Sequence, residues 1–355
     1  MIPSGVIYGS PVSIIGNGVV VDPKALLSEI SYLKEKGIEP KLLVSDRCHI
    51  IMPYHIELDS ALSGHQAELA AGSTGRGIAP VYADKMFRNG IRMIDLLEPD
   101  ILKQKLEKGY AFAKGIIEKS LNKKMISEPK SIFQNYIDFG IKLKDYVSDT
   151  SVELYKAHKN GKSILFEGAQ GISLDVDHGI YPYTTSSNTA AGHISTGTGV
   201  SFRDIGRIIG VVKAYLSRVG ESPLPSEIDD EMAEKIRDVG GEYGTTTGRP
   251  RRIGWLDLVQ VRQAVRVNGL TEIALTKLDV LNGIKEIPVC IDYEIDGSTV
   301  SEMPASLTMY RNAKPVYKTL EGWDSIPDNI WDRGFNALPK DCLLYTSDAA
   351  DENPS

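Results

Sequence analysis

The chain has 355 residues, of which 42% are hydrophobic and 25% are charged, so it can bury one large core or two. Its formal net charge of −7 argues against a general binder of nucleic acid or of membrane surfaces, but it allows a local basic pocket. The cysteines Cys48, Cys290 and Cys342 lie far apart without CxxC spacing, which argues against a disulfide framework and against a zinc site.

The amino-terminal residues predict a strand, a helix and a second strand. Residues 13–21 favour a strand that two glycines interrupt. Asp22 and Pro23 suit the N-cap and the first position of a helix that ends at about residue 36, and residues 41–44 form the next apolar run. No charged leader segment precedes these elements, and no apolar run approaches the ~20 residues that span a bilayer. We therefore expect a cytoplasmic protein.

Strands and helices alternate along the rest of the chain. The expected elements are, in order, a helix at 57–70, a mostly helical segment at 99–160, a strand at 205–214, a helix at 255–267, a strand at 270–276 and a hairpin at 287–300. The hairpin prediction rests on the dipeptide Asp296-Gly297. This alternation argues for an α/β fold with a largely parallel central sheet.

A loop rich in polar residues follows a predicted strand at 163–166. Gly168 and Gly171 flank Gln170, so the backbone could approach a planar ligand while the Gln170 amide offers a hydrogen-bond donor and an acceptor. Ordering such a loop costs conformational entropy, and the functional reason for this cost is that the loop holds polar groups in fixed positions. On composition alone, a turn-rich surface loop remains the alternative.

Two further segments suit anionic ligands. Residues 71–77, AGSTGRG, combine small residues, two hydroxyl groups and one arginine, which suits a phosphate, although a glycine-rich turn alone is weak evidence. Residues 244–248, GTTTG, lead directly into Arg249, Arg251 and Arg252, and arginine suits bidentate binding of carboxylates and phosphates. The alternative is a basic surface patch, which we disfavour because nothing acidic follows nearby to neutralise it.

Asp279 follows the apolar run 273–275 and is expected at the carboxyl end of a strand, where ligands bind in open α/β sheets. A carboxylate there can accept hydrogen bonds from guanine N1–H and N2–H, while the stem of Lys277 can cover the ring face. The spacing in LTKLD resembles the guanine-specificity motif of GTP-binding proteins.

The motifs are, in chain order, IPSGV and IIGNGVV near the start, STGRGIAPVYADK at 73–85, FEGAQG and LDVDHGIYPYTTSSNT within 166–189, KAYLSRVG at 213–220, EYGTTTGRPRRIGWLD at 242–257 and LTKLDVL at 275–281. They closely resemble the adenylosuccinate synthetase family, in family order and over roughly residues 2–340. The resemblance implies a P-loop-GTPase-like α/β fold with a mostly helical insertion at 99–160. We expect a single domain over 1–340 and a non-native or disordered tail at 341–355.

The resemblance also implies a function, the GTP-dependent ligation of IMP and L-aspartate to adenylosuccinate with release of GDP and phosphate, in AMP biosynthesis. The family requires Mg²⁺ and uses GTP as co-substrate. The residues implied for IMP are Thr74, Gln170, Thr185, Val219 and Arg249, with Arg88 acting across a homodimer interface on the partner's IMP phosphate. Those implied for aspartate are Thr245, Thr246, Thr247, Gly248, Arg249 and Arg251, and those for GTP are Arg251, Lys277, Leu278 and Asp279. Gln170 is expected to act in catalysis, at the 6-oxygen of IMP.

Two of the family's segments do not occur among the 355 residues. The GDEGKGK and GGHNAGHT segments hold the family's general base, its general acid and its Mg²⁺ ligands. His178, His193 and the pair Asp175 and Asp177 belong to other motifs and do not replace them. We therefore expect a truncated synthetase without metal ligands that is inactive by itself. The alternatives are a non-catalytic IMP-binding module and an unstable fragment.

The chain departs from the family pattern at two further places. Pro250 stands where relatives often carry arginine, and it is expected to stiffen the loop because its ring fixes φ. After residue 339 the sequence DCLLYTSDAADENPS has neither a helical nor a strand period and does not resemble the family's carboxyl-terminal end. This is the basis for the expected tail.

Overall fold

The computed structural model describes residues 2–63, 74–244, 248–327 and 329–350. The chain divides into two compact units, one made of Met1–Asp177 with Thr184–Ile205 and the other of His178–Tyr183 with Gly206–Ser355. Each unit has its own buried apolar core, whereas we expected one domain over 1–340.

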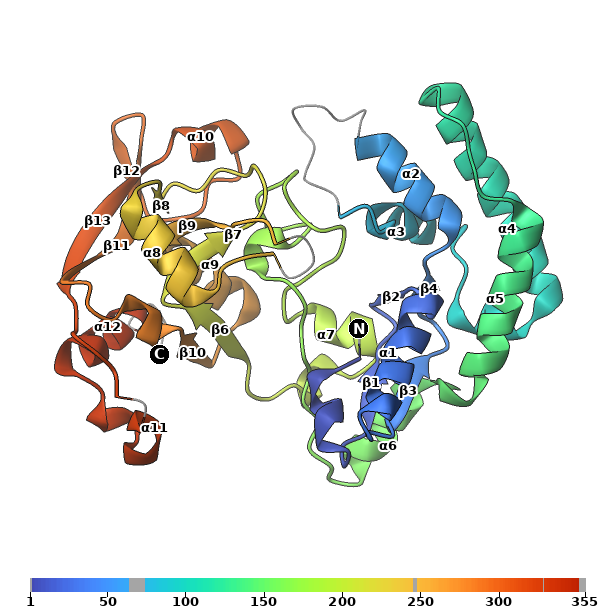
Figure 1. The fold of residues 1–355 in the computed structure, drawn as a ribbon, viewed down its shortest axis with the longest axis horizontal. Helices are drawn as coiled ribbons and strands as arrows, with labels where there is room; N and C mark the ends of the chain where they lie inside the picture. The colour runs from blue at the N-terminus through green and yellow to red at the C-terminus, as the bar shows by residue number, and fades with distance from the viewer. Residues whose placement is uncertain (1, 64–73, 245–247, 328, 351–355) are drawn as a thin grey trace. The chain divides into compact units, whose positions relative to one another are not determined.

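In the part of the first unit that the structure describes, the strands form two small parallel sheets (Figure 1). One has the order β1-β3-β5, and the other pairs β2 with β4; their bounds are β1 (Ser13–Ile15), β2 (Val20–Val21), β3 (Leu42–Ser45), β4 (His49–Ile50) and β5 (Val147–Ser148). The strand expected at 13–21 is therefore two strands. The chain turns between them, and the Gly18 N–H donates to the carbonyl of Gly197 (2.8 Å).

The helix expected after Asp22 is confirmed as α1 (Pro23–Glu35). The Asp22 carboxylate accepts hydrogen bonds from the N–H groups of Lys24 (2.9 Å) and Ala25 (3.3 Å), which have no partner inside the helix. Leu26 and Ile30 lie one turn apart on its buried face and pack in the core of the first unit.

The other helices of the first unit are α2 (Pro53–Ser63), α3 (Ile78–Phe87), α4 (Pro99–Gly115), α5 (Pro129–Leu143), α6 (Thr150–Lys159) and α7 (His193–Thr198). The mostly helical segment expected at 99–160 is thus confirmed. Figure 1 shows α4 and α5 side by side. On α5, Ile132 and Tyr136 are buried, and Gly140 allows a close approach, because a Cβ there would lie 2.4 Å from the Leu96 carbonyl oxygen.

The prediction of a strand at 163–166 is wrong. These residues pair with no strand in the described ranges, and the side chain of Leu165 is 92% exposed. A four-residue apolar run is ambiguous without a neighbouring strand to take up its backbone hydrogen bonds.

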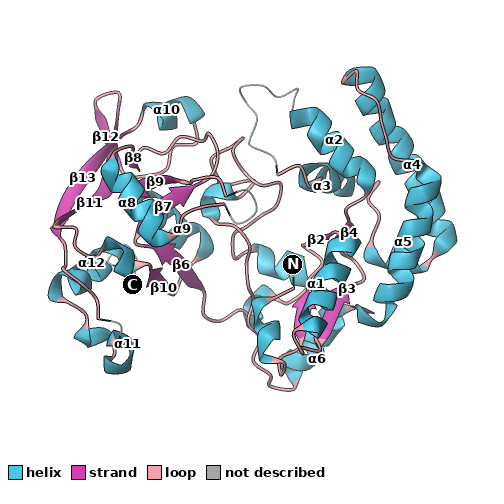
Figure 2. Cartoon of the chain, viewed as in Figure 1, coloured by secondary structure: helices cyan, strands magenta, loops and turns pink. Residues whose placement is uncertain are grey.

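The described residues of the second unit form three sheets, whose strands are drawn in magenta in Figure 2. One is the parallel pair of β6 (Ile209–Lys213) and β10 (Glu272–Thr276). The antiparallel sheets have the orders β7-β9-β8 and β12-β11-β13; the bounds are β7 (Tyr215–Arg218), β8 (Glu227–Ile228), β9 (Arg252–Trp255), β11 (Glu286–Ile295), β12 (Ser298–Val300) and β13 (Lys314–Glu321). The expected hairpin is confirmed at β11–β12, where Asp296 and Gly297 both have positive φ, as a two-residue type I′ turn requires.

The helices of the second unit are α8 (Glu231–Gly240), α9 (Leu258–Asn268), α10 (Leu307–Asn312), α11 (Ile330–Arg333) and α12 (Lys340–Ala350). The helix expected at 255–267 begins three residues later than predicted, because β9 includes Trp255 and pairs with both β7 and β8. Asp257 then caps α9 by accepting from the N–H groups of Val259 (3.0 Å) and Gln260 (3.3 Å).

The expectation of a tail without regular structure after residue 340 is wrong for residues 341–350, which belong to α12. Cys342 and Tyr345 are buried in the core of this unit, and the Tyr345 ring packs edge-on against Trp323 at a centroid distance of 5.7 Å. Tertiary contacts stabilise a helix that its sparse apolar pattern does not predict. Residues 351–355 lie outside the described residues. The α/β class itself is confirmed.

Candidate functional site

The predicted site residues are divided between the two units. The first unit holds Thr74, Arg88, Gln170 and Thr185. The second holds Val219, Gly248, Arg249, Arg251, Lys277, Leu278 and Asp279. Thr245, Thr246 and Thr247 lie outside the described residues.

Thr74 is exposed at the start of a short turn that leads into α3. Gly77 ends this turn at φ 76°, and its N–H donates to the buried carboxylate of Asp59 on α2 (2.8 Å). A Cβ at Gly77 would lie 2.9 Å from the backbone of His55 and of Ile56, so only glycine fits. The contact with α2 therefore fixes where the Thr74 turn enters α3.

A buried pair joins the same two helices. Met52 N–H donates to His55 Nδ1 (3.0 Å), so the proton of the neutral imidazole is on Nε2 and is donated to Asp84 on α3 (2.9 Å). Burial lowers the pKa of His55, although the hydrogen bond with Asp84 opposes this. The pair fixes the position of α3 relative to α2.

Arg88 is the residue that ends α3, and its side chain is exposed. Its φ of 65° lies in the left-handed region, and its N–H donates to the carbonyl of Lys85 (3.2 Å). One helix of the first unit thus carries Thr74 before its first residue and Arg88 after its last. The sequence prediction that Arg88 is not buried in its own core is confirmed.

Gln170 is exposed and has a φ of 61°, which is uncommon for a residue with a side chain. A Cβ at either flanking glycine would meet nothing within 4 Å, so crowding within the chain does not require glycine at 168 or 171. The chain therefore leaves open space beside both glycines.

The loop around Thr185 is organised by Asp175, whose role the sequence did not reveal. Asp175 is fully buried and accepts hydrogen bonds from the N–H groups of Asp177 (2.9 Å), Thr189 (2.5 Å) and Ala190 (3.1 Å). The Thr185 N–H donates to the carbonyl of Leu174 (2.8 Å). A carboxylate that accepts several backbone hydrogen bonds fixes a loop without regular structure.

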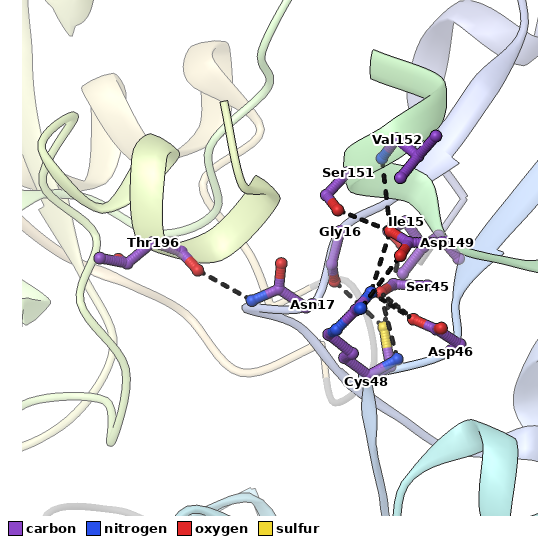
Figure 3. A network of polar contacts seen from close by, with 11 residues as sticks. Ile15, Gly16, Asn17, Ser45, Asp46, Cys48, Asp149, Ser151, Val152 and Thr196 are labelled. Carbon is purple, nitrogen blue, oxygen red and sulfur yellow. Dashed lines mark hydrogen bonds and ion pairs between the residues drawn. The ribbon is translucent and has the colours of Figure 1, made fainter. Parts of the chain in front are cut away.

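A second polar network lies at the carboxyl ends of β1 and β3 (Figure 3). Arg47 pairs with Asp46 (3.0 Å) and Asp149 (2.9 Å), and hydrogen bonds from Arg47 and Ser151 hold the pKa of Asp149 below its usual range. Cys48 is fully buried, and burial raises the pKa of its thiol to about 12, so it is a thiol rather than a thiolate at neutral pH. Ligands often bind at this end of a parallel sheet, but these groups hold one another.

Each of the three clustered arginines of the second unit has an acidic partner. Arg249 lies 3.5 Å from Glu221, Arg251 lies 2.9 Å from Glu242, and Arg252 forms an ion pair with Glu227 on β8. The expectation that no acidic residue neutralises this cluster is therefore wrong. All three acids precede the arginines in the sequence, whereas the expectation rested only on the residues after Arg252.

Glu242 is the least exposed of these acids and collects three donors. Its carboxylate accepts hydrogen bonds from Lys213 Nζ (2.5 Å), the Tyr215 hydroxyl (2.8 Å) and Arg251 Nη1 (2.9 Å). Burial raises the pKa of Glu242, but the hydrogen bonds from Lys213 and Tyr215 outweigh it, so the pKa lies below its ordinary value of 4.5. Glu242 is therefore ionised at neutral pH.

Two other predicted residues of this unit, Val219 and Lys277, belong to segments near Arg251 and Glu242. Arg218 of β7 pairs with Arg252 of β9, so Val219 and Arg251, the residues just outside the two strands, lie at the same end of the sheet. Lys277 Nζ donates to the carbonyl of Gly240, two residues before Glu242 (3.0 Å).

The LTKLD segment, which resembles the guanine-specificity motif of GTP-binding proteins, lies where the sequence predicted, just beyond a strand. β10 ends at Thr276, and Asp279 is exposed in the short 3-10 turn that follows. Leu278 is buried in the core and anchors this turn, while Lys277 has a φ of 65°. Gly248 also has a positive φ, and its N–H donates to Gly244 (2.7 Å).

The metal that the resemblance implies finds no ligand set in the described residues. Within 2–63, 74–244, 248–327 and 329–350, no three His, Cys, Asp or Glu side chains come together as metal ligands. We therefore assign no residue to Mg²⁺. Among the same residues, no helix is both long and apolar enough to cross a bilayer.

The chain resembles known proteins over nearly its whole length. The family model described as adenylosuccinate synthetase matches residues 1–351, which includes most of the tail that we expected to fall outside the resemblance. The adenylosuccinate synthetase of Clostridium acetobutylicum is 47% identical over 349 residues, covering 97% of this chain and 81% of the relative. That of Geobacter sulfurreducens is 49% identical over 348 residues, covering 97% and 80%. These matches do not show the truncation that we expected.

The fold is similar to a solved structure of the fully ligated adenylosuccinate synthetase from Plasmodium falciparum. The TM-score is 0.90 at 32% sequence identity, and the match covers 99% of this chain and 83% of the other. The likeness therefore extends over both compact units.

Proposed function

The chain belongs to the adenylosuccinate synthetase family, and we propose that its residues serve the GTP-dependent ligation of IMP and L-aspartate in AMP biosynthesis. One observation carries the assignment of residues. Arg251 and Lys277, from motifs far apart in the sequence, contact a single turn, the first at Glu242 and the second at Gly240. The family resemblance implies aspartate and GTP as the ligands of Arg251, and GTP as the ligand of Lys277.

The chemistry has two steps. The 6-oxygen of IMP takes the γ-phosphoryl group of GTP, and the bond to the β-phosphate breaks to leave GDP. The aspartate amine then attacks C6 and loses its proton, and phosphate departs with the 6-oxygen. Both steps depend on positioning and on stabilising developing negative charge, which amide donors and guanidinium groups supply. At the 6-oxygen we assign this role to Gln170.

For IMP we assign Thr74, Gln170, Thr185, Val219 and Arg249, together with the partner subunit's Arg88 in a homodimer. The exposed side chains of Thr74 and Gln170 support this, as does the rigid entry of the Thr74 turn into α3. Arg88 is exposed at the end of α3, so its guanidinium is available to a neighbouring subunit. A bidentate contact between arginine and phosphate is strong and specific.

For the other two substrates the assignments come from the second unit. Those for aspartate are Thr245, Thr246, Thr247, Gly248, Arg249 and Arg251, and those for GTP are Arg251, Lys277, Leu278 and Asp279. The exposed position of Asp279 just beyond β10 supports its role as acceptor for guanine, with buried Leu278 as the anchor of the turn.

Calorimetric titration of the purified 355-residue chain with IMP and with GTP, followed by a product assay with aspartate, tests this function. We expect saturable binding of both nucleotides, with GTP bound more tightly than ATP. Failure to bind either nucleotide would contradict the assignments. We expect no adenylosuccinate from the 355 residues alone, because the family's general acid and base belong to motifs that they do not contain. Turnover would contradict that expectation and would exclude a non-catalytic IMP-binding module.

A further inference from the structure

We propose that Glu242 is the positioning residue that aims Arg251 at GTP and aspartate. The inference rests on the proposed function, because Arg251 is the residue assigned to both ligands. Glu242 itself is only 2% exposed and belongs to none of the assigned ligand contacts. It acts through the arginine that it holds.

Arg251 is fixed at three points. Its Nη1 donates to Glu242 Oε2 (2.9 Å), and its backbone N–H donates to the carbonyl of the same residue (3.0 Å). Its own carbonyl accepts from Arg237 Nε on α8 (2.9 Å). Backbone and side chain are thus both tied to the end of α8, which limits the directions in which the guanidinium can point. Arg251 is still 29% exposed, so part of the fork remains accessible.

Glu242 is itself held by residues from two strands. Lys213, the last residue of β6, and Tyr215 on β7 both donate to Oε1, so Oε2 is directed at Arg251. Lys213 Nζ also donates to the Ser217 hydroxyl (2.6 Å). A buried carboxylate with three donors, two of them cationic, is stable, but its removal leaves the cations without their acceptor.

The same turn is fixed from the side of the guanine motif. Lys277 Nζ donates to the Gly240 carbonyl, and Tyr215 packs so closely that a Cβ at Gly240 would lie 2.3 Å from its hydroxyl oxygen. The carboxylate, the guanine motif and the Arg251 guanidinium are therefore parts of one assembly. A change at Glu242 should alter the binding of GTP and leave IMP binding largely as it is, because Lys213, Tyr215 and Arg251, which donate to its carboxylate, are not among the residues assigned to IMP.

Two explanations of Glu242 give opposite results. If it positions Arg251, removing its charge weakens GTP binding because the guanidinium loses its direction. If it only neutralises a cation that GTP would otherwise meet, the same change strengthens GTP binding, since the local charge becomes more positive. The sign of the change decides between them.

The test compares Glu242→Gln with Glu227→Gln in the full chain. Glu227 is the matched control, because it pairs with Arg252 in the adjoining strands and neither residue is assigned to a ligand. For Glu242→Gln we expect at least tenfold weaker GTP binding by calorimetry and an unchanged dissociation constant for IMP. For the control we expect both constants unchanged. Unchanged or tighter GTP binding by Glu242→Gln would overturn the proposal.

Two further measurements keep the test decisive. Tyr215→Phe replaces Glu242→Gln in the test if Glu242→Gln does not fold. It preserves the buried ring and removes one donor to Glu242, so it should weaken GTP binding, by a smaller factor than Glu242→Gln. Nuclear magnetic resonance with isotope-labelled arginine reads the Arg251 guanidinium without any ligand. Its protons should exchange slowly in the wild type and in Glu227→Gln, and rapidly in Tyr215→Phe and Glu242→Gln. Rapid exchange in the wild type would overturn the positioning role, whereas a wild type that binds no GTP but keeps slow exchange would contradict only the proposed function.

Discussion

Replacing Gly77 by alanine should destabilise the first unit far more than replacing Gly75. Both glycines have positive φ, 76° and 66°, so each alanine incurs the left-handed penalty of about 1–2 kcal/mol. At Gly77 the new Cβ also lies 2.9 Å from backbone atoms of His55 and Ile56, whereas at Gly75 it meets nothing within 4 Å. Overpacking against backbone that cannot move away adds about 1–3 kcal/mol. The difference between the two variants therefore isolates the clash with α2.

Alkylation of Cys48 in increasing urea measures this difference. Cys48 is fully buried, and the other cysteines, Cys290 and Cys342, belong to the second unit, so its labelling, read by mass spectrometry, reports the opening of the first unit. We expect the free energy of opening to fall by about 1–2 kcal/mol for Gly75→Ala and by about 2–5 kcal/mol for Gly77→Ala. Equal losses would refute the reasoning, because the close approach of the turn to α2 would then contribute nothing.

Three other predictions concern single side chains. Burial, together with the cations Lys85 and Arg92, lowers the pKa of His49 to about 4. The free energy of unfolding should therefore fall by roughly 3 kcal/mol as pH drops from 6.5 to 4, because the unfolded state binds a proton at His49 more readily. In His49→Gln, the urea midpoint should fall less over the same pH range. Asp279→Asn should shift nucleotide preference from GTP towards XTP, more than tenfold, in competition binding. Arg88→Leu should weaken IMP binding and spare GTP. Mixing it with Arg249→Leu should restore IMP binding at half of the sites in mixed dimers, because one site then has both wild-type arginines. If subunits are shown to exchange and binding is not restored, Arg88 lies in its own subunit's site.

The elements that the sequence predicted correctly are those that local chemistry determines. Asp22 and Pro23 mark the start of α1, and Asp296-Gly297 defines the β11–β12 turn, because the conformational preferences of these residues act within a few positions. The run at 163–166 and the strand β9 were assigned wrongly because pairing with distant strands decides them. Helix α12 was missed for the same reason, since its buried residues gain stability only from the surrounding core.

The candidate site shows the same limit. The position of Asp279 beyond a strand was predictable, because strand ends and the motif that follows them lie within ten residues. The acidic partners of the arginines were not predictable from the sequence. Glu221 and Glu227 come from earlier segments, and the pairing of β8 with β9 brings Glu227 to Arg252, while Glu221 precedes β8 and lies near Arg249. The buried roles of Asp175 and Glu242 likewise depend on donors that the fold brings together.

Helix α3 has a mechanical consequence for a homodimer. Its ten residues span about 15 Å, with Thr74 just ahead of one end and Arg88 at the other. The buried His55–Asp84 pair and the Asp59 contact to Gly77 prevent it from sliding or rotating on α2. In the proposed dimer this helix is a rigid lever with one end in its own subunit's IMP site and the other in its neighbour's. The helix therefore fixes the spacing between the residues that it contributes to the two IMP sites.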